Sequence, residues 1–188
     1  MAQARTLKDK ELKQLLSHIT LYRHASRNRA ILACTHFGGM RVGEVAALRY
    51  CDVLAADGSI LAEIRLSAEQ TKGDRARVVY LPEKLRKELT IYVRAYPATT
   101  LIKPLFYTQK RDGFNANTLT QTLFYIYRRA GLLGASSHTG RRTFITTLAN
   151  KGVSVRLLQA LAGHRNIGTT QCYIDVNDAM KRAAVELV

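Results

Sequence analysis

Apolar residues recur every three or four positions along most of the chain, which is the spacing of amphipathic helices. This pattern predicts helices at residues 7–19, 26–37, 42–48, 82–96, 117–129, 139–150, 154–162 and 169–174. Thr6 and Asn117 resemble helix N-caps, the pair Gly38-Gly39 suits a left-handed helix end, and Gly163 marks the end of a later helix. The last segment, 175–188, keeps the same apolar spacing and is predicted to be a further helix.

The periodicity changes between residues 53 and 81. Asp57-Gly58 is a turn signal, and the segments 60–66 and 75–81 are rich in β-formers. Two or three antiparallel strands are predicted here. The expected fold class is therefore mainly α with a small antiparallel β-sheet (α+β), and 188 residues correspond to one domain at ~150 residues per domain.

The charge is unusual for such a chain. Lys and Arg total 29 against 14 Asp and Glu, so the formal net charge is +15. Residues 113–174 contain no acidic residue, and their basic residues are Arg128, Arg129, Arg141, Arg142, Lys151, Arg156 and Arg165. A solvated surface or an anionic membrane would also suit basic residues, but surfaces usually mix both signs. A polyanion such as nucleic acid is the favoured partner.

The other residue types in the sequence indicate the cellular location and limit the kinds of chemistry that the protein can perform. The three cysteines form no C-x-x-C pair, and no apolar run or leader sequence appears, so we expect a cytoplasmic protein without a membrane partner. Carboxylates are few, and neither H-E-x-x-H nor G-x-x-x-x-G-K-[ST] occurs. We therefore expect no metal and no cofactor, and any phosphate must be neutralised by the protein's own cations.

Four places carry residues suited to phosphate chemistry. Arg41 follows the Gly38-Gly39 helix end, His138 and Arg141 stand three apart at a predicted helix start, His164 follows Gly163, and Tyr173 lies nine residues later. Each has an ordinary alternative on its own. Arg41 would pair with Glu44 on the surface, lone histidines are more often packing residues, and most tyrosines belong to the core or its rim.

The ordered combination is more specific than any single motif. G-G-M-R-V-G-E-V-A-A-L-R, Q-T-K-G-D-R-A-R-V-V-Y-L-P, S-H-T-G-R-R-T-F-I-T and L-A-G-H through T-T-Q-C-Y occur in this order. Together they resemble tyrosine recombinases of the phage-integrase type, over nearly the whole chain. The resemblance implies the tyrosine-recombinase catalytic fold and a site-specific DNA recombinase.

By this resemblance, Tyr173 attacks a DNA phosphodiester and forms a 3′-phosphotyrosine. Arg41 and Arg141 bind the non-bridging oxygens, a task for which the planar guanidinium is suited. Lys72 donates a proton to the leaving 5′-oxygen, although Arg75 or Arg77 could share that site. His138 acts as a base or hydrogen-bond partner, and His164 contacts the phosphate. Arg142 stands where many members have His.

The resemblance also bears on organisation. Residues 1–188 are expected to be a single catalytic domain, with an N-terminal helix in 1–25 and a tail helix in 175–188. The separate core-binding domain of full-length integrases is not expected here, so the chain is either a catalytic fragment or a single-domain recombinase. A homo-oligomer, a tetramer on paired double-stranded DNA sites, is the expected assembly. The alternatives are a non-catalytic DNA-binding accessory protein and a type IB topoisomerase-like enzyme.

Overall fold

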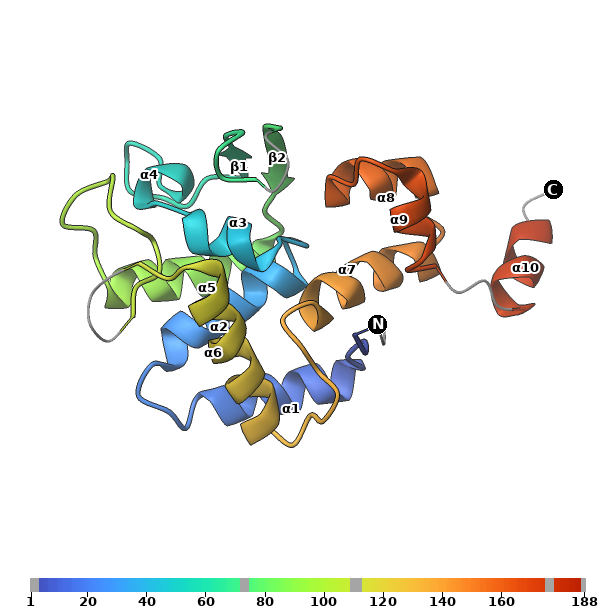
Figure 1. Cartoon of the computed structure of the whole chain (residues 1–188), viewed down its shortest axis with the longest axis horizontal. Helices are drawn as coiled ribbons and strands as arrows, with labels where there is room; N and C mark the ends of the chain where they lie inside the picture. The colour runs from blue at the N-terminus through green and yellow to red at the C-terminus, as the bar shows by residue number, and fades with distance from the viewer. Residues whose placement is uncertain (1–3, 72–74, 109–112, 175–177, 187–188) are drawn as a thin grey trace.

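The computed structural model describes residues 4–71, 75–108, 113–174 and 178–186 as a mostly helical molecule with one small hairpin (Figure 1). Its helices are α1 Asp9–Ile19, α2 Ala25–His36, α3 Val42–Ala47, α4 Tyr50–Val53, α5 Glu83–Ala95, α6 Ala116–Arg129, α7 Thr139–Asn150, α8 Val155–Ala162, α9 Ile167–Gln171 and α10 Asp178–Val185. The predicted α+β class with few strands is confirmed.

The two strands, β1 Glu63–Leu66 and β2 Arg77–Tyr80, form an antiparallel pair. Ile64 pairs with Val79, and both side chains are buried. Both strands are shorter than the segments 60–66 and 75–81 predicted from sequence. The short hairpin stands beside α3 in Figure 1, with α8 and α9 across from it.

Helix α2 is the centre of the core. Its residues Ala30 to Thr35 are all buried, because α5 and α7 pack against it and α1 and α3 lie alongside. The main cluster of buried apolar residues extends from Leu7 to Ala135. Among the described residues, those of α8 lie outside this cluster, although Leu158 and Ala162 are themselves buried. Apolar packing to the main core therefore does not by itself account for the position of α8.

Two helix starts differ from the sequence expectation. Helix α1 begins at Asp9 with Lys8 rather than Thr6 as its N-cap, and the carboxylate of Glu11 accepts the Lys8 backbone N–H at 2.8 Å. Helix α6 is capped by Asn115 rather than Asn117, because the Asn115 side chain accepts the Thr118 N–H at 2.9 Å. Both corrections follow from hydrogen bonds that apolar spacing does not encode.

The sequence pattern also gave the wrong bounds for one short helix and missed another. Helix α9 covers Ile167–Gln171 rather than 169–174, because Asn166 caps it through the Gly168 N–H at 2.8 Å. Helix α4, a single turn, was not predicted. The predicted tail helix is present as α10, and 175–177 and 187–188 lie outside the described residues. In the part of the chain that the structure describes, no helix is both long and apolar enough to cross a membrane.

The turn after α2 depends on Gly39. Its φ is +59°, and a Cβ at this position would lie 2.5 Å from Cδ1 of Phe144 on α7. We expect Gly39→Ala to lower the free energy of unfolding by about 2–4 kcal/mol, because strain and a steric clash add. Gly58→Ala is the matched control, since Gly58 has φ +79° with nothing within 4 Å of its Cβ position. Chemical denaturation of both variants measures the difference, and equal losses would contradict the role of Phe144.

Candidate active site

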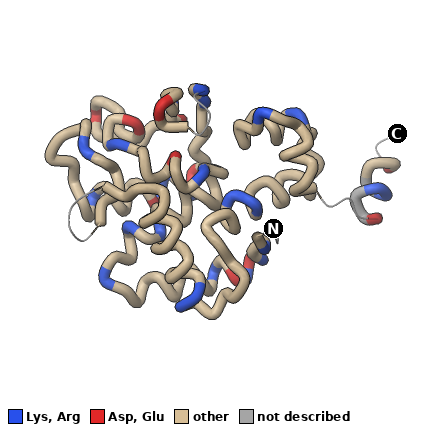
Figure 2. Tube along the Cα trace, viewed as in Figure 1, with Lys and Arg blue, Asp and Glu red and all other residues tan. Residues whose placement is uncertain are grey.

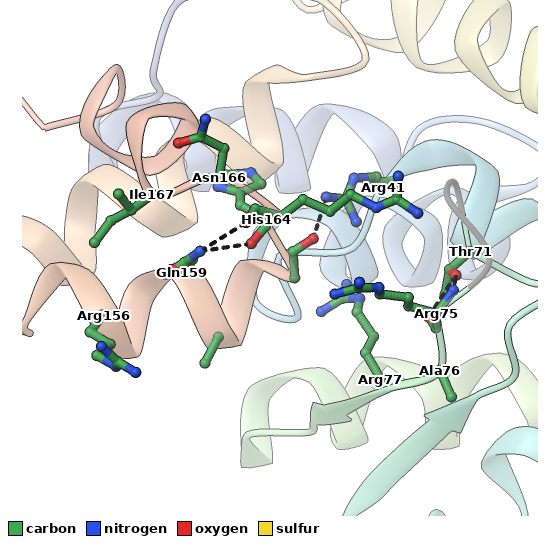
Figure 3. A pocket seen from close by; sticks show the side chains of 13 residues that line it. Arg41, Thr71, Arg75, Ala76, Arg77, Arg156, Gln159, His164, Asn166 and Ile167 are labelled. Atoms are coloured by element: carbon green, nitrogen blue, oxygen red, sulfur yellow. Dashed lines mark hydrogen bonds between the residues drawn. The ribbon is translucent and has the colours of Figure 1, made fainter.

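A cleft of ≈ 750 Å³ lies between the hairpin side of the molecule and the α8–α9 pair. Its charged lining residues are Arg41, Arg75, Arg77, Arg156 and Arg165, together with His164 (Figure 3). No Asp or Glu is among the described residues that line it. Figure 2 shows the same imbalance along α7, α8 and α9, where the trace carries Lys and Arg but no acidic residue. The cleft is therefore suited to an anion.

Arg41 is the N-cap of α3 and reaches across to the end of α8. Its Nη1 donates to Oε1 of Glu44 at 2.9 Å, and its Nη2 donates to the carbonyl of Gly163 at 2.8 Å. The side chain keeps 24% of its surface exposed toward the cleft. The pair with Glu44 that was the ordinary alternative for Arg41 is thus present, and Arg41 nevertheless lines the cleft.

Arg141 lies in the first turn of α7 and is 4% exposed. Its Nη1 donates to the Gly39 carbonyl at 2.6 Å and its Nη2 to the Ala162 carbonyl at 2.5 Å. Burial, followed by the positive charge of Arg41, lowers the pKa of Arg141 to about 9. The guanidinium therefore stays protonated at neutral pH.

Glu44 and Arg77 complete the cluster; the sequence indicated Glu44 only as a surface partner of Arg41, and Arg77 only as a residue that could share the Lys72 site. Glu44 is 1% exposed, and both of its oxygens accept from Arg77, at 3.1 Å from Nε and 2.7 Å from Nη2. Burial alone would raise the pKa of Glu44, but Arg77 and the Arg41 backbone N–H hold it below its usual range. Two signals in the sequence could have indicated these residues. Glu44 is an acid within the apolar run Val42 to Ala46, and Arg77 lies two positions before Val79, so its side chain is on the same, buried face of the strand.

The three arginines share one target, the end of α8. The carbonyls of Leu161, Ala162 and Gly163 accept from Arg77, Arg141 and Arg41 respectively. The last carbonyls of a helix have no partner within the helix and carry its negative dipole end, so cations are favoured there. Gly163 ends the helix at the position predicted from sequence, and its φ of +62° is left-handed.

His164 follows directly after this helix end. Its Nδ1 lies 2.9 Å from the hydroxyl of buried Thr170. Burial and the nearby charges of Arg141, Arg41 and Arg77 lower the pKa of His164 to about 4. The imidazole is therefore neutral at pH 7. In the tautomer that accepts the Thr170 hydroxyl at Nδ1, Nε2 carries a proton and is a hydrogen-bond donor.

Tyr173 and His138 line a neighbouring cavity of ≈ 710 Å³, which shares Asn166 with the cleft. The Tyr173 ring stacks on His164 with centroids 5.7 Å apart, and the Arg142 guanidinium lies 5.6 Å from the Tyr173 ring centre. His138 is the exposed N-cap of α7. The structure thus brings Arg41, Arg141 and His164 together and places Tyr173 against His164, while His138 lines the second cavity together with Tyr173.

Lys72 lies outside the described residues, so its predicted role stays a prediction. Its described neighbours Thr71 and Arg75 are joined by a hydrogen bond from the Thr71 hydroxyl to the Arg75 carbonyl at 2.7 Å. Arg75 lines the cleft from this side. In the described parts of the chain, no group of three or more His, Cys, Asp or Glu side chains is placed to hold a metal ion.

Comparison with known proteins gives consistent matches. The model of the phage integrase family matches residues 5–180. Tyrosine recombinase XerC of Lactobacillus delbrueckii is 30% identical over 166 residues, which cover 85% of this chain and 53% of the relative. The chain thus spans about half the length of this curated relative.

Solved structures agree in fold. The crystal structure of XerA recombinase matches with a TM-score of 0.78 and 26% identity, covering 100% of this chain and 66% of that one. The XerH site-specific recombinase, solved in a pre-cleavage complex with its difH substrate, matches with a TM-score of 0.69 and 27% identity, covering 96% of this chain and 53% of that one. The catalytic-domain fold expected from the motifs is therefore confirmed.

The depressed pKa of His164 predicts a pH effect on stability. The ordinary value is 6.5 and the folded value about 4, so between them the unfolded chain binds the proton and the folded chain does not. Stability is therefore lost as the pH falls from 6.5 toward 4. Because His164 is partly exposed and water screens its charge, we expect its contribution to be about 1 kcal/mol.

Urea unfolding of wild type and His164→Gln at pH 8, 7, 6 and 5 measures this contribution. The free-energy gap between the two proteins should be constant at pH 8 and 7 and narrow at lower pH, since only the wild type carries the imidazole. A gap that stays constant down to pH 5 would contradict the depressed pKa.

Proposed function

This chain belongs to the phage integrase family, and from this premise we propose that it is a site-specific DNA recombinase that breaks and rejoins DNA through Tyr173. The observation that carries the proposal is the position of the Tyr173 ring, which stacks on His164 beside three clustered arginines. A tyrosine at the edge of a cationic cleft has both a nucleophilic oxygen and neighbours able to stabilise an anionic transition state.

The proposed reaction exchanges one phosphodiester for another. The Tyr173 oxygen attacks the phosphorus, the bond from phosphorus to the 5′-oxygen breaks, and the products are a 3′-phosphotyrosine and a 5′-hydroxyl. His138 accepts the phenolic proton, and Lys72 supplies the proton of the leaving 5′-oxygen. A 5′-hydroxyl of a partner strand reverses the step and releases the tyrosine. No external energy source is needed, because the number of phosphodiester bonds is unchanged.

The arginines are proposed to stabilise the negative charge of the transition state. We propose that Arg41 and Arg141 bind the non-bridging oxygens, since the contacts described above use two of the five N–H donors of each guanidinium. Neutral His164 adds a hydrogen bond from Nε2 to the same phosphate. A guanidinium offers bidentate geometry that a lysine ammonium lacks, so the residue type matters as well as the charge.

The proposed partner is double-stranded DNA. The net charge of +15 and the acid-free segment 113–174 support contact with a phosphate backbone. The similar XerH recombinase was solved on its difH substrate. We further propose that residues 1–188 form one catalytic domain and that the active assembly is a homo-tetramer on paired sites, as the family resemblance implies.

Trapping the covalent intermediate tests the proposal. A cognate duplex is first selected from a random-sequence pool by binding to the protein, and is then nicked so that the released fragment diffuses away after cleavage. The wild type should accumulate a covalent protein–DNA adduct, whereas Tyr173→Phe should bind the duplex and form no adduct, because it lacks the attacking oxygen. Tyr125→Phe is the matched control, since Tyr125 is 54% exposed on α6, and it should react as the wild type does.

The outcomes separate the alternatives. Absence of adduct from the wild type on the selected duplex would favour a non-catalytic DNA-binding protein. Relaxation of supercoiled plasmids that lack the selected sequence would favour a type IB topoisomerase-like activity. Adduct formation by Tyr173→Phe would show that another residue is the nucleophile.

A further inference from the structure

Arg77 is the most heavily bonded of the clustered arginines. It binds both oxygens of Glu44, at 3.1 and 2.7 Å, and donates through Nη1 to the Leu161 carbonyl at 2.8 Å. Its side chain is 9% exposed, whereas that of Arg41 is 24% exposed. Arg77 therefore belongs to the wall of the cleft, and Arg41 is better placed to meet a ligand (Figure 3).

Glu44 is shared unequally between the two arginines. Arg77 holds the carboxylate in a bidentate pair, which is the stronger geometry. Arg41 makes one side-chain contact with Glu44, at 2.9 Å to Oε1, and its Nη2 is held by Gly163. The position of the Arg41 guanidinium is thus a balance between the attraction of Glu44 and the hydrogen bond to the end of α8.

The charge balance depends on Arg77. Arg41, Arg77 and Arg141 carry three positive charges around the single carboxylate of Glu44, which leaves the cluster with a net charge of plus two. A buried carboxylate requires a partner, and loss of one partner leaves a strong uncompensated charge. Without Arg77, the remaining salt-bridge partner of Glu44 would be Arg41.

We propose that Arg77 is a positioning residue that occupies Glu44 so that Arg41 keeps its charge and its place in the cleft for phosphate. The proposal rests on the function proposed above and assigns Arg77 no contact with the DNA. It differs from a purely structural role in one respect. If Arg77 acts by occupying Glu44, neutralising Glu44 should compensate for its loss, whereas a missing structural support would stay missing.

The test compares Arg77→Met, Arg77→Lys, Glu44→Gln and the double variant Arg77→Met/Glu44→Gln. Single-turnover cleavage of the nicked duplex at saturating protein gives the rate constant, and titration of an uncleaved duplex in a Tyr173→Phe background gives the affinity. We expect Arg77→Met to slow cleavage roughly 10- to 100-fold with an affinity change within about threefold. The double variant should cleave faster than Arg77→Met alone. Arg65→Met, on the neighbouring strand with an 83% exposed side chain, is the control and should stay within about twofold of wild type.

A second readout is independent of DNA. Phenylglyoxal labels accessible arginines, and mass spectrometry of peptides gives the rate at Arg41. We expect labelling of Arg41 to slow about threefold or more in Arg77→Met, because Glu44 then binds Arg41 more tightly, and to recover in the double variant. This readout stands even if the wild type forms no adduct, so failure of the proposed function and failure of the Arg77 proposal remain distinguishable.

Several results would overturn the proposal. A double variant that is as slow as Arg77→Met, with unchanged labelling of Arg41, would show a structural role only. If Arg77→Met does not fold, as judged by circular dichroism, Arg77→Lys carries the test: it keeps the charge beside Glu44 but loses the bidentate pair, so it should cleave within about tenfold of wild type. A loss above about tenfold in a folded Arg77→Lys protein would contradict the charge-balance role.

Discussion

Three consecutive carbonyls, the last two of α8 and that of its C-cap Gly163, organise the site, because each binds an arginine from a different element. Arg41 precedes α3, Arg77 belongs to β2 and Arg141 to α7, and the three reach Gly163, Leu161 and Ala162. Like charges gathered in a partly buried space repel one another, and the helix end together with Glu44 offsets that repulsion. The same hydrogen bonds attach α8, whose residues lie outside the main apolar cluster, to the rest of the protein. The proposed anion binding and the tertiary attachment of α8 thus use one set of groups.

This arrangement also affects the protonation state of His164, which stacks on Tyr173. Burial, together with three positive charges that disfavour a fourth, lowers the pKa of His164 to about 4, so the imidazole is neutral. A neutral imidazole can lie against Tyr173 and still donate one hydrogen bond. The backbone of Tyr173 is in turn tied to α7, since its carbonyl accepts the Thr146 hydroxyl at 3.1 Å. Helix α7 therefore carries Arg141 at its beginning and anchors the tyrosine further along.

The sequence predicted the parts of this site that depend on local signals. Apolar spacing placed α7 and α8, and Gly163 marked the end of α8 in front of His164. Sequence reasoning did not reach the pairing of Glu44 with Arg77, because it joins α3 to β2, two elements that only the tertiary fold brings together. Cap residues were assigned less well, since Asn115 and Asn117 are the same residue type and only hydrogen-bond geometry distinguishes them. The position of Lys72 is not described, so its role rests on the family resemblance.

The left-handed turn at Gly163 has a consequence for protein engineering. A Cβ there would lie 2.7 Å from Cδ of Arg77, and the Gly163 carbonyl is the acceptor for Arg41. If only the side chains of the proposed site were grafted onto another helical scaffold, the arginines would lack the backbone carbonyls that hold them in place. A transplant would have to carry the α8 terminus with its glycine, and the strand that bears Arg77, as a single module. The smallest unit that could be transferred is therefore this backbone, the α8 terminus and the strand, together with the side chains attached to it.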